Sequence, residues 1–418
     1  MTRVVLAALA LALPLAGSTS AAPRASCPRD GRLGAVAYLR AASLRVVDLG
    51  TCRSKVVVPR GAQAPVRWSP NGRWILFGGS RVVAATGGSP VRPLGGRVTG
   101  LTWSSKGDQL AGITASGGVV VGRPGGSPRR LLPDGWGATA VRFDPDGGFL
   151  AVSRTVLGRR GNAGVTPLRQ EIWVVNVANK RRFTLYRVPR GVAPPQLVGW
   201  SPDGLWVLWW SRLQRSNSLD ADGRPLKAAP AGREGRLVTV VPRMLLYEDF
   251  LTSCGKRLVL TAGGIRSTTS GKQLLSVAIP TWRAKNLAPN LAYSWVSPAC
   301  SADGSQIAVA AGRTGEPRFG RERRSLWVVA VDGSTRRVVA RSRAPYTYEL
   351  PRWSRDGHTL LFVRSGPTNA NANARGALFT LRIGAAPVGP IADLGTSGNY
   401  YGHYAWADQL DWYRPPTG

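Results

Sequence analysis

The sequence predicts an all-β protein, a propeller of four-stranded blades, on the strength of three observations. One turn motif recurs along the chain at intervals of 35 to 57 residues. A short apolar segment follows nearly every copy of it. The 418 residues include 51 glycines and 31 prolines, a composition typical of a chain that turns often and forms few long helices.

The motif is an aromatic residue, a Ser-Pro-Asp-Gly-like turn and an apolar strand. Proline fixes φ at the second turn position, Asp or Asn accepts local backbone hydrogen bonds, and glycine takes the positive φ. The copies begin at Trp68, Trp103, Phe143, Trp200, Leu251, Cys300, Trp353 and Trp406, with the Leu251 copy degraded and the Trp406 copy truncated. The spacing is typical of propeller blades. Eight copies predict eight blades; seven is the alternative, if a short early repeat or the terminal strands merge into a neighbour.

The remaining strands of each repeat follow in order. Continuous apolar runs indicate strands buried on both faces, as between neighbouring blades. Second strands are expected at 74–77, 149–152, 206–210, 257–260, 306–310 and 359–363, third strands at 171–175, 325–329 and 377–381, and basic fourth strands at 181–186 and 335–339.

The two ends of the chain are expected to share one blade. Segments 35–40, 44–48 and 55–58 are typical of second, third and fourth strands with no first strand before them. Segment 403–406 is typical of a first strand with little after it. Pairing the two ends would close the ring and leave no open sheet edge.

The Trp-Ser-Pro-Asp-Gly turn, with its apolar second strand and basic fourth strand, resembles the WD-like propeller repeats of the TolB family. The propeller domain of prolyl-oligopeptidase-type enzymes has a similar repeat. The resemblance covers residues 33–412, and it implies a single propeller domain there, after a signal peptide at 1–22 and a linker at 23–32, with a tail at 413–418. The resemblance indicates little about function, because propellers serve in binding, scaffolding and catalysis alike.

The N-terminus has the features of a secretory signal. Arg3 precedes an apolar run at 4–13, and small residues at 16–22 provide a cleavage site. The run is about half of the roughly 20 residues that a membrane-spanning helix needs. We therefore expect a protein of the periplasm or cell wall, with no transmembrane segment after the signal is removed.

Four cysteines fit an oxidising compartment. Three pairings are possible, and the repeat map favours Cys27–Cys52 and Cys254–Cys300, the second joining adjacent blades. No two cysteines are close enough in sequence for a zinc knuckle.

Catalytic and metal signatures are weak. The chain has two histidines, His358 and His403, and no Gly-x-Ser-x-Gly elbow. The carboxylate pairs Asp144/Asp146 and Asp220/Asp222 do not continue to a full calcium ligand set. We therefore expect no catalytic residues, no metal and no cofactor.

Two surfaces are candidates for binding. Strands alternate in direction across a blade, so the connections after second and fourth strands emerge on one face. Polar residues gather in the connections that lead to the channel mouth: Tyr247, Glu248, Asp249, Tyr293, Tyr348, Glu349, His403 and Tyr404. Long insertions after second strands, at 154–170, 211–224, 312–324 and 365–376, should surround the same mouth. Two of them are basic and form a predicted basic rim: Arg159, Arg160, Arg321, Arg323 and Arg324, with further arginines at 154, 169, 313 and 318.

The formal net charge of +34, with seven Lys among 56 basic residues and hence 49 Arg, suits anionic partners outside the cytoplasm. A compositional bias toward arginine would produce the same charge without a function. We expect a monomeric, non-catalytic scaffold for an envelope protein or an anionic cell-surface polymer, with no specific nucleic-acid binding. The alternatives are a propeller enzyme, either a polysaccharide lyase or a hydrolase, and a module that binds a glycan or small ligand at the channel mouth.

Overall fold

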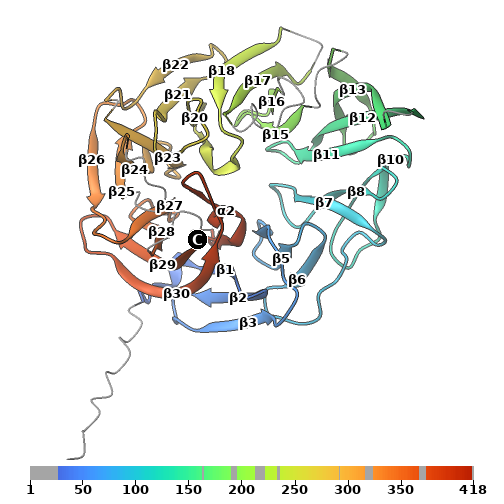
Figure 1. Ribbon diagram of the computed structural model, residues 1–418. Helices are drawn as coiled ribbons and strands as arrows, with labels where there is room; N and C mark the ends of the chain where they lie inside the picture. Colours follow the sequence, from blue (N-terminus) through green and yellow to red (C-terminus); the bar gives the residue numbers. More distant parts are fainter. Residues whose placement is uncertain are drawn as a thin grey trace, which may run out of the picture.

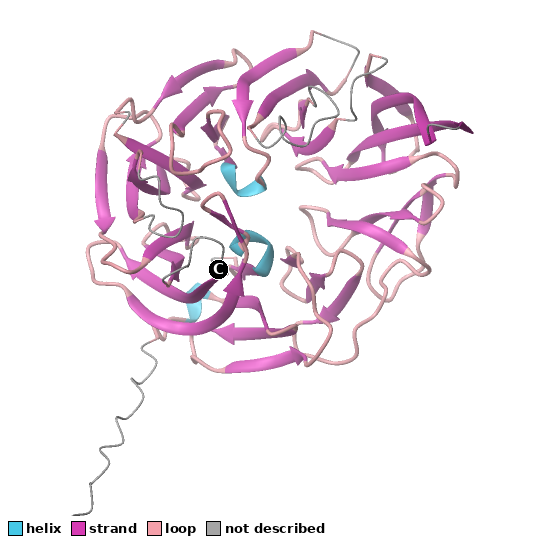
Figure 2. Cartoon of the chain, viewed as in Figure 1, coloured by secondary structure: helices cyan, strands magenta, loops and turns pink. Residues whose placement is uncertain are grey.

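The computed structural model describes residues 27–161, 164–189, 195–211, 222–232, 236–290, 292–315, 323–366 and 373–416. Eight sheets stand around one axis (Figures 1 and 2), so the predicted eight-bladed propeller is confirmed. The predicted signal peptide at 1–22 lies outside the described residues.

We number the blades in chain order and give the innermost strand first. Blade 1 is β33 (Leu410–Tyr413), β1 (Ala35–Arg40), β2 (Ser43–Asp48) and β3 (Ser54–Val58). Blade 2 is β4 (Val66–Trp68), β5 (Trp74–Phe77) and β6 (Arg81–Ala84), and blade 3 is β7 (Val98–Trp103), β8 (Leu110–Thr114), β9 (Val119–Gly122) and β10 (Arg129–Leu132). Blade 4 is β11 (Ala138–Phe143), β12 (Phe149–Gly161), β13 (Gly164–Asn176) and β14 (Arg182–Arg187).

Blade 5 is β15 (Gln196–Trp200), β16 (Trp206–Trp210), β17 (Arg224–Pro230) and β18 (Val238–Met244). Blade 6 is β19 (Leu251–Cys254), β20 (Arg257–Ala262), β21 (Gln273–Ala278) and β22 (Arg283–Asn286). Blade 7 is β23 (Tyr293–Cys300), β24 (Gln306–Arg313), β25 (Ser325–Ala330) and β26 (Arg336–Ala340). Blade 8 is β27 (Thr347–Trp353), β28 (Thr359–Ser365), β29 (Ala374–Arg382) and β30 (Val388–Ser397).

Three short elements lie outside the main blade strands. They are the 3-10 turns η1 (Gly31–Leu33) and η2 (Glu248–Phe250), and the helix α2 (Trp406–Gln409). A two-stranded hairpin, β31 (Asn399–Tyr400) and β32 (His403–Tyr404), follows blade 8. In blade 2, the backbone bridge between Val82 and Val91 stands where a fourth strand would be.

The ring closes through both chain ends, as predicted, but the closing strand lies further along the chain than expected. Trp406 is not on an innermost strand: it begins α2, packs against Gly376, and donates from Nε1 to Ser365 Oγ at 3.0 Å. Trp412, on β33, pairs with Val36 and so takes the eighth repeat position. The alternating sequence Leu410-Asp411-Trp412 suits a strand with every second residue buried.

The turn motif works as its residue types predict. Ser301 Oγ donates to Asp303 Oδ1 at 2.5 Å and accepts from the Gln306 N–H at 3.0 Å. Asp303 Oδ1 also accepts from the Ser305 N–H, and these hydrogen bonds lower the pKa of Asp303 to about 2. The same bonds form in the turns that begin at Ser69, Ser201 and Ser354. We name this side of the ring the turn face, and the opposite side the connection face.

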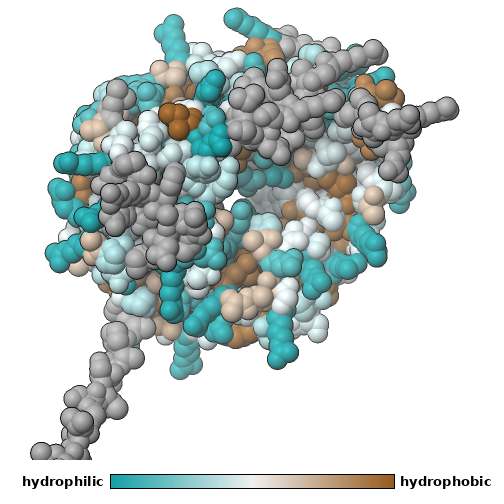
Figure 3. Space-filling model, viewed as in Figure 1, coloured by the Kyte–Doolittle hydropathy of each residue, from teal (hydrophilic) through white to brown (hydrophobic). Residues whose placement is uncertain are grey.

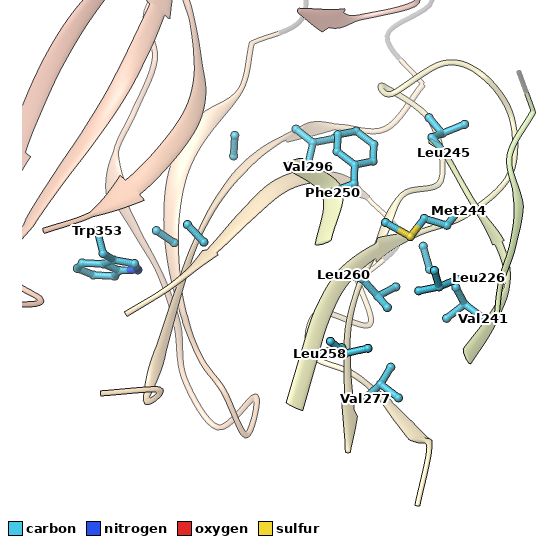
Figure 4. Packing of buried hydrophobic residues seen from close by; sticks show 14 of the residues in the cluster. Leu226, Val241, Met244, Leu245, Phe250, Leu258, Leu260, Val277, Val296 and Trp353 are labelled. Atoms are coloured by element: carbon cyan, nitrogen blue, oxygen red, sulfur yellow. The ribbon is translucent and has the colours of Figure 1, made fainter. Parts of the chain in front are cut away.

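The core lies between neighbouring blades rather than at the axis. Figure 4 shows one part of it, where Leu226, Val241 and Met244 of blade 5 face Leu258 and Leu260 of blade 6. All five side chains are buried, and burying each one contributes about 1.5–3 kcal/mol.

Both predicted disulfides are confirmed. The Cα atoms are 5.9 Å apart in Cys27–Cys52 and 5.4 Å apart in Cys254–Cys300. The second bridge joins the ends of β19 and β23, the innermost strands of blades 6 and 7. Among the described residues, no helix has the length and apolar character to cross a membrane.

Candidate functional site

The centre of the ring is hollow, as the space-filling view shows (Figure 3). Three adjoining cavities follow one another along the axis. The upper cavity, of about 600 Å³, opens beside Tyr247, Glu248 and His403; the middle one, of about 340 Å³, lies beside Arg352 and Asp411; and the lower one, of about 590 Å³, is lined by turn residues and Arg355. Arg67 and Asp411 line both the upper and middle cavities, and Arg414 lines both the middle and lower ones, so the three form one channel.

The residue just before the repeat's aromatic position lines this channel in several blades, because side chains alternate along a strand. Arg67, Arg142, Arg352 and Asp411 hold this position in blades 2, 4, 8 and 1. None of the four is among the site residues predicted from the sequence. Period-two alternation on the first strands, counted from each anchor, was the signal that could have identified them.

At the upper mouth, residues far apart in the sequence form one aromatic and ionic cluster. The rings of Tyr247 and His403 stack with centroids 3.5 Å apart. His403 Nε2 lies 3.0 Å from Asp249 Oδ1, and Ser297 Oγ donates to Asp249 Oδ2 at 2.6 Å. Burial alone would raise the pKa of Asp249, but His403 and the Ser297 hydrogen bond bring it below its ordinary value. Burial raises the pKa of Tyr247. Tyr247, Asp249 and His403 therefore lie in contact with one another beside the upper cavity.

Glu248 stands at the same mouth and links two blades. Its carboxylate accepts from Arg142 at 2.9 Å and lies 3.7 Å from Arg67, whose Nη2 also donates to Asp408 of α2 at 3.1 Å. The Glu248 side chain is nevertheless 57 % exposed. The mouth thus presents polar groups that are held in place and still face solvent.

Two predicted site residues have a different role from the one expected. Arg324 is 2 % exposed and Glu349 is 5 % exposed, so neither belongs to a solvent-facing rim or mouth. Arg324 Nη1 donates to Glu349 Oε1 at 2.6 Å, and Nη2 donates to Thr268 Oγ1 and to the Gly402 carbonyl. The physical reason is the length of the arginine: it reaches inward to a carboxylate and satisfies the backbone of the β31–β32 hairpin.

This network holds the hairpin that carries His403. The Thr268 N–H donates to the Tyr401 carbonyl at 2.9 Å, which ties the loop 263–271 of blade 6 to the hairpin. Lys272, at the end of that loop, donates to the carbonyls of Gly264, Ile265 and Ser270. Burial lowers the pKa of Lys272 to about 8.

The other mouth residues are mainly packing residues. Tyr348 packs edge-on against Phe362, Tyr293 packs edge-on against Trp327, and Tyr404 is buried. In the basic rim, Arg323 is exposed, the side chains of Arg159 and Arg160 are outside the described part, and Arg321 and Arg318 are outside the described residues.

Several other charged residues have structural partners. Glu171 is buried beside Arg154, Arg169 and Arg187; of the two predicted surface arginines among them, Arg154 is mostly buried and Arg169 remains exposed. Asp222 forms paired contacts with Arg266 at 3.0 and 3.1 Å; its sequence neighbour Asp220 is outside the described residues. Over the described ranges, no three His, Cys, Asp or Glu side chains are grouped as metal ligands.

Comparisons with known proteins identify the fold and go no further. No protein family matches the chain, and no curated protein does. Among solved structures, dipeptidyl peptidase 4 from Porphyromonas gingivalis matches 89 % of this chain and 58 % of its own, at 11 % identity and a TM-score of 0.56. A structure from a study of two prolyl endopeptidases matches 92 % of this chain and 51 % of its own, at 10 % identity and a TM-score of 0.50. A protein assigned as TolB from Agrobacterium tumefaciens matches 89 % of this chain and 98 % of its own, at 15 % identity and a TM-score of 0.38.

This chain thus spans little more than half the length of the two peptidase structures. At these identities, the two structures with TM-scores of 0.50 and 0.56 show a shared fold and say nothing of a shared activity. The chain is an eight-bladed β-propeller.

Proposed function

We propose that this protein is an extracytoplasmic, non-catalytic binding propeller, and that it holds a polar segment of an envelope partner protein at the upper mouth of its channel. The observation that carries the proposal is the cavity of about 600 Å³ lined by Tyr247, Glu248 and His403. It combines an aromatic platform with a fixed, exposed carboxylate, a combination that suits protein recognition.

The mouth is organised before any partner arrives. Arg67 and Arg142 hold the Glu248 carboxylate, and the stacked His403 holds the Tyr247 ring. Side chains that are already ordered lose less conformational entropy on binding, so more of the contact energy appears as affinity. Glu248 would accept hydrogen bonds from backbone or side-chain N–H groups of the partner.

Two observations support an extracytoplasmic location. Both cysteine pairs are bridged, and disulfides persist mainly in oxidising compartments. The signal sequence predicted at 1–22 agrees with this compartment.

A second candidate function, acid–base catalysis, has one observation in its favour: the Asp249–His403 pair beside the same cavity. Both Asp249 oxygens already accept, from His403 and Ser297, and the His403 ring is stacked on Tyr247. These contacts favour a positioning role for the pair. Turnover of a peptide or uronate substrate by the purified protein, lost in His403→Gln, would support the enzyme reading instead.

The test of the binding function begins with crosslinking of the mature protein in envelope fractions and purification of the protein it captures. Affinity is then measured by biolayer interferometry for the parent, Tyr247→Ala and Glu248→Ala. We expect at least a tenfold loss for each variant. Leu205→Ala, an exposed apolar residue on the turn face, should stay within twofold. Unchanged affinity in both mouth variants would overturn the proposal.

The predicted basic rim is a second candidate contact, for an anionic envelope component. Because Arg324 is buried, a clean rim variant replaces only Arg159, Arg160, Arg321 and Arg323 with Gln. Electrostatic attraction is screened by salt, so this variant should bind envelope material more weakly at low ionic strength and like the parent at high ionic strength. If the variant and the parent bind equally at low ionic strength, the arginines of the predicted rim reflect only a compositional bias and form no anionic binding site.

A further inference from the structure

The middle of the channel holds an arginine that differs from its counterparts in other blades. Arg67, Arg142 and Arg352 occupy the same repeat position, and each donates from Nη1 to the carbonyl of the preceding residue, at 2.8, 3.1 and 3.1 Å. Their shared local geometry makes them a matched set.

Their partners differ. Arg67 is bound to Asp408, and Arg142 is bound to Glu248. Within the described ranges, no Asp or Glu oxygen lies within 4.0 Å of the Arg352 guanidinium, and the Pro351 carbonyl is its hydrogen-bond acceptor. Arg352 faces the middle cavity of about 340 Å³ with most of its five N–H donors uncommitted.

The surroundings add positive charge. Arg414, whose Nη1 donates to the Trp353 carbonyl at 2.8 Å, lines the same cavity, and Arg355 lines the next one toward the turn face. Burial lowers the pKa of Arg352. The negative charges of Asp249 and Asp411 raise this pKa, and the positive charges of Arg414 and Arg67 lower it further. Burial lowers the pKa of Arg414 in the same way, with repulsion from Arg355 added.

The nearby carboxylates already have donors of their own. Asp411 Oδ2 accepts from the Trp68 N–H at 2.7 Å and Oδ1 accepts from the Trp412 N–H at 2.9 Å. Asp249 is bound by His403 and Ser297. Glu248 also lines this cavity and accepts from Arg142. The three carboxylates balance the charge of the three arginines that line the cavity, but none in the described part of the chain forms an ion pair with Arg352.

We propose that the middle cavity is a binding site for an oxyanion, a carboxylate or phosphate group that enters from the turn face and is held by Arg352 and Arg414. The planar guanidinium suits bidentate contact with either group. The middle cavity shares Glu248 and Asp249 with the mouth proposed for the partner, but Arg352 and Arg414 line the middle cavity and not the upper one, so the proposed anion contacts are distinct from the partner contacts.

Thermal unfolding and isothermal titration calorimetry of the full mature protein test the site. The probes are sodium phosphate and sodium citrate, with sodium chloride added to keep ionic strength constant. We expect saturable binding to the parent and at least a tenfold weaker affinity in Arg352→Met. Arg336→Met, which removes an exposed arginine from β26, controls for general attraction to a basic surface. The probe that binds more tightly identifies the class of the natural group as phosphate or carboxylate.

In the absence of either probe, Arg352→Met should unfold at the same temperature as the parent or higher, because it removes a buried cation from beside two others. If Arg352→Met fails to fold, Arg352→Lys keeps the charge but loses the planar fork, and it should retain weakened binding. Equal affinity in the parent and the folded Arg352 variant, or no saturable binding to the parent, would overturn the proposal. Tyr247→Ala should leave anion binding intact, which separates this site from the partner site.

Discussion

The two faces of the ring are held together by different kinds of contact. On the turn face, the turn serine donates to an Asp or Asn two residues later, and the same bond recurs in four blades. On the connection face, Arg324 binds Glu349, Thr268 and Gly402, which are 25, 56 and 78 residues away. Asp249 and His403 are 154 residues apart. Many hydrogen bonds between residues close in sequence therefore stabilise the scaffold. The channel mouth depends instead on a few contacts between residues far apart in the sequence.

The first prediction concerns the long-range contact with the largest expected effect, the buried ion pair between Arg324 and Glu349. Arg324→Met should destabilise the protein by about 3–5 kcal/mol, because it removes the buried cation that pairs with the buried Glu349 carboxylate. Guanidinium denaturation measures the change. The double variant Arg324→Met, Glu349→Met should recover much of the loss, and Arg323→Met, at the exposed neighbouring position, should change stability by less than about 0.5 kcal/mol. If Arg324→Met lowers the free energy of unfolding by less than about 1 kcal/mol, the long-range contacts of the connection face are not more important for stability than the local bonds of the turn face.

The second prediction concerns Lys272, which closes the loop that supports the hairpin. Its pKa is about 8 in the folded protein, below the ordinary value of 10.5. Below pH 8 both the folded and unfolded states carry the proton, so the cost of burying the ammonium is present in full. Between pH 8 and 10.5 the folded state releases the proton first, so stability should rise with pH, by up to about 3 kcal/mol.

Lys272→Met lacks this titration and serves as the control. The difference in unfolding free energy, parent minus variant, should increase between pH 8 and 10, measured by chemical denaturation at each pH. A difference that stays flat or falls over this interval would show that the three carbonyls keep the ammonium charged.

The third prediction is the smallest and applies to the turn face. Ser354→Ala removes the donor to Asp356 and leaves the buried Thr359 N–H without its acceptor, so it should cost about 1–3 kcal/mol. The equivalent changes at Ser201 and Ser301 should cost the same within about 0.5 kcal/mol, since the bonds are the same. Unequal losses of stability among the three variants, measured by thermal unfolding, would mean that the turn hydrogen bonds contribute differently from blade to blade.

The fold was predictable because its determinants are local. The Trp206–Trp210 strand and the Ser301 turn carry their structure in a few adjacent residues, and the repeat supplies eight related copies. The error at Trp406 arose where the repeat is truncated. With no full turn motif to align it, a tryptophan at the expected spacing was taken for the anchor, although Trp412 fills that position.

The candidate site was predictable only in part. The predicted topology brought Tyr247 and His403 to one mouth. No sequence pattern indicates that Arg324 points inward to Glu349, or that Lys272 donates hydrogen bonds to three backbone carbonyls. Those contacts depend on how connections of unrelated sequence fold over one another. Arg352 could have been found from alternation along β27, but the absence of an acidic partner for it among the described residues follows only from the arrangement of neighbouring blades.

Hydrogen exchange of the whole protein, with and without its purified envelope partner, tests most directly whether the connection face is the functional one. If the partner binds there, we expect slower exchange at 245–252 and 399–409, the two segments that meet at the upper mouth, and no change at the turns 69–73 and 201–205. Protection of those turns, with exchange at 245–252 and 399–409 unchanged, would contradict it.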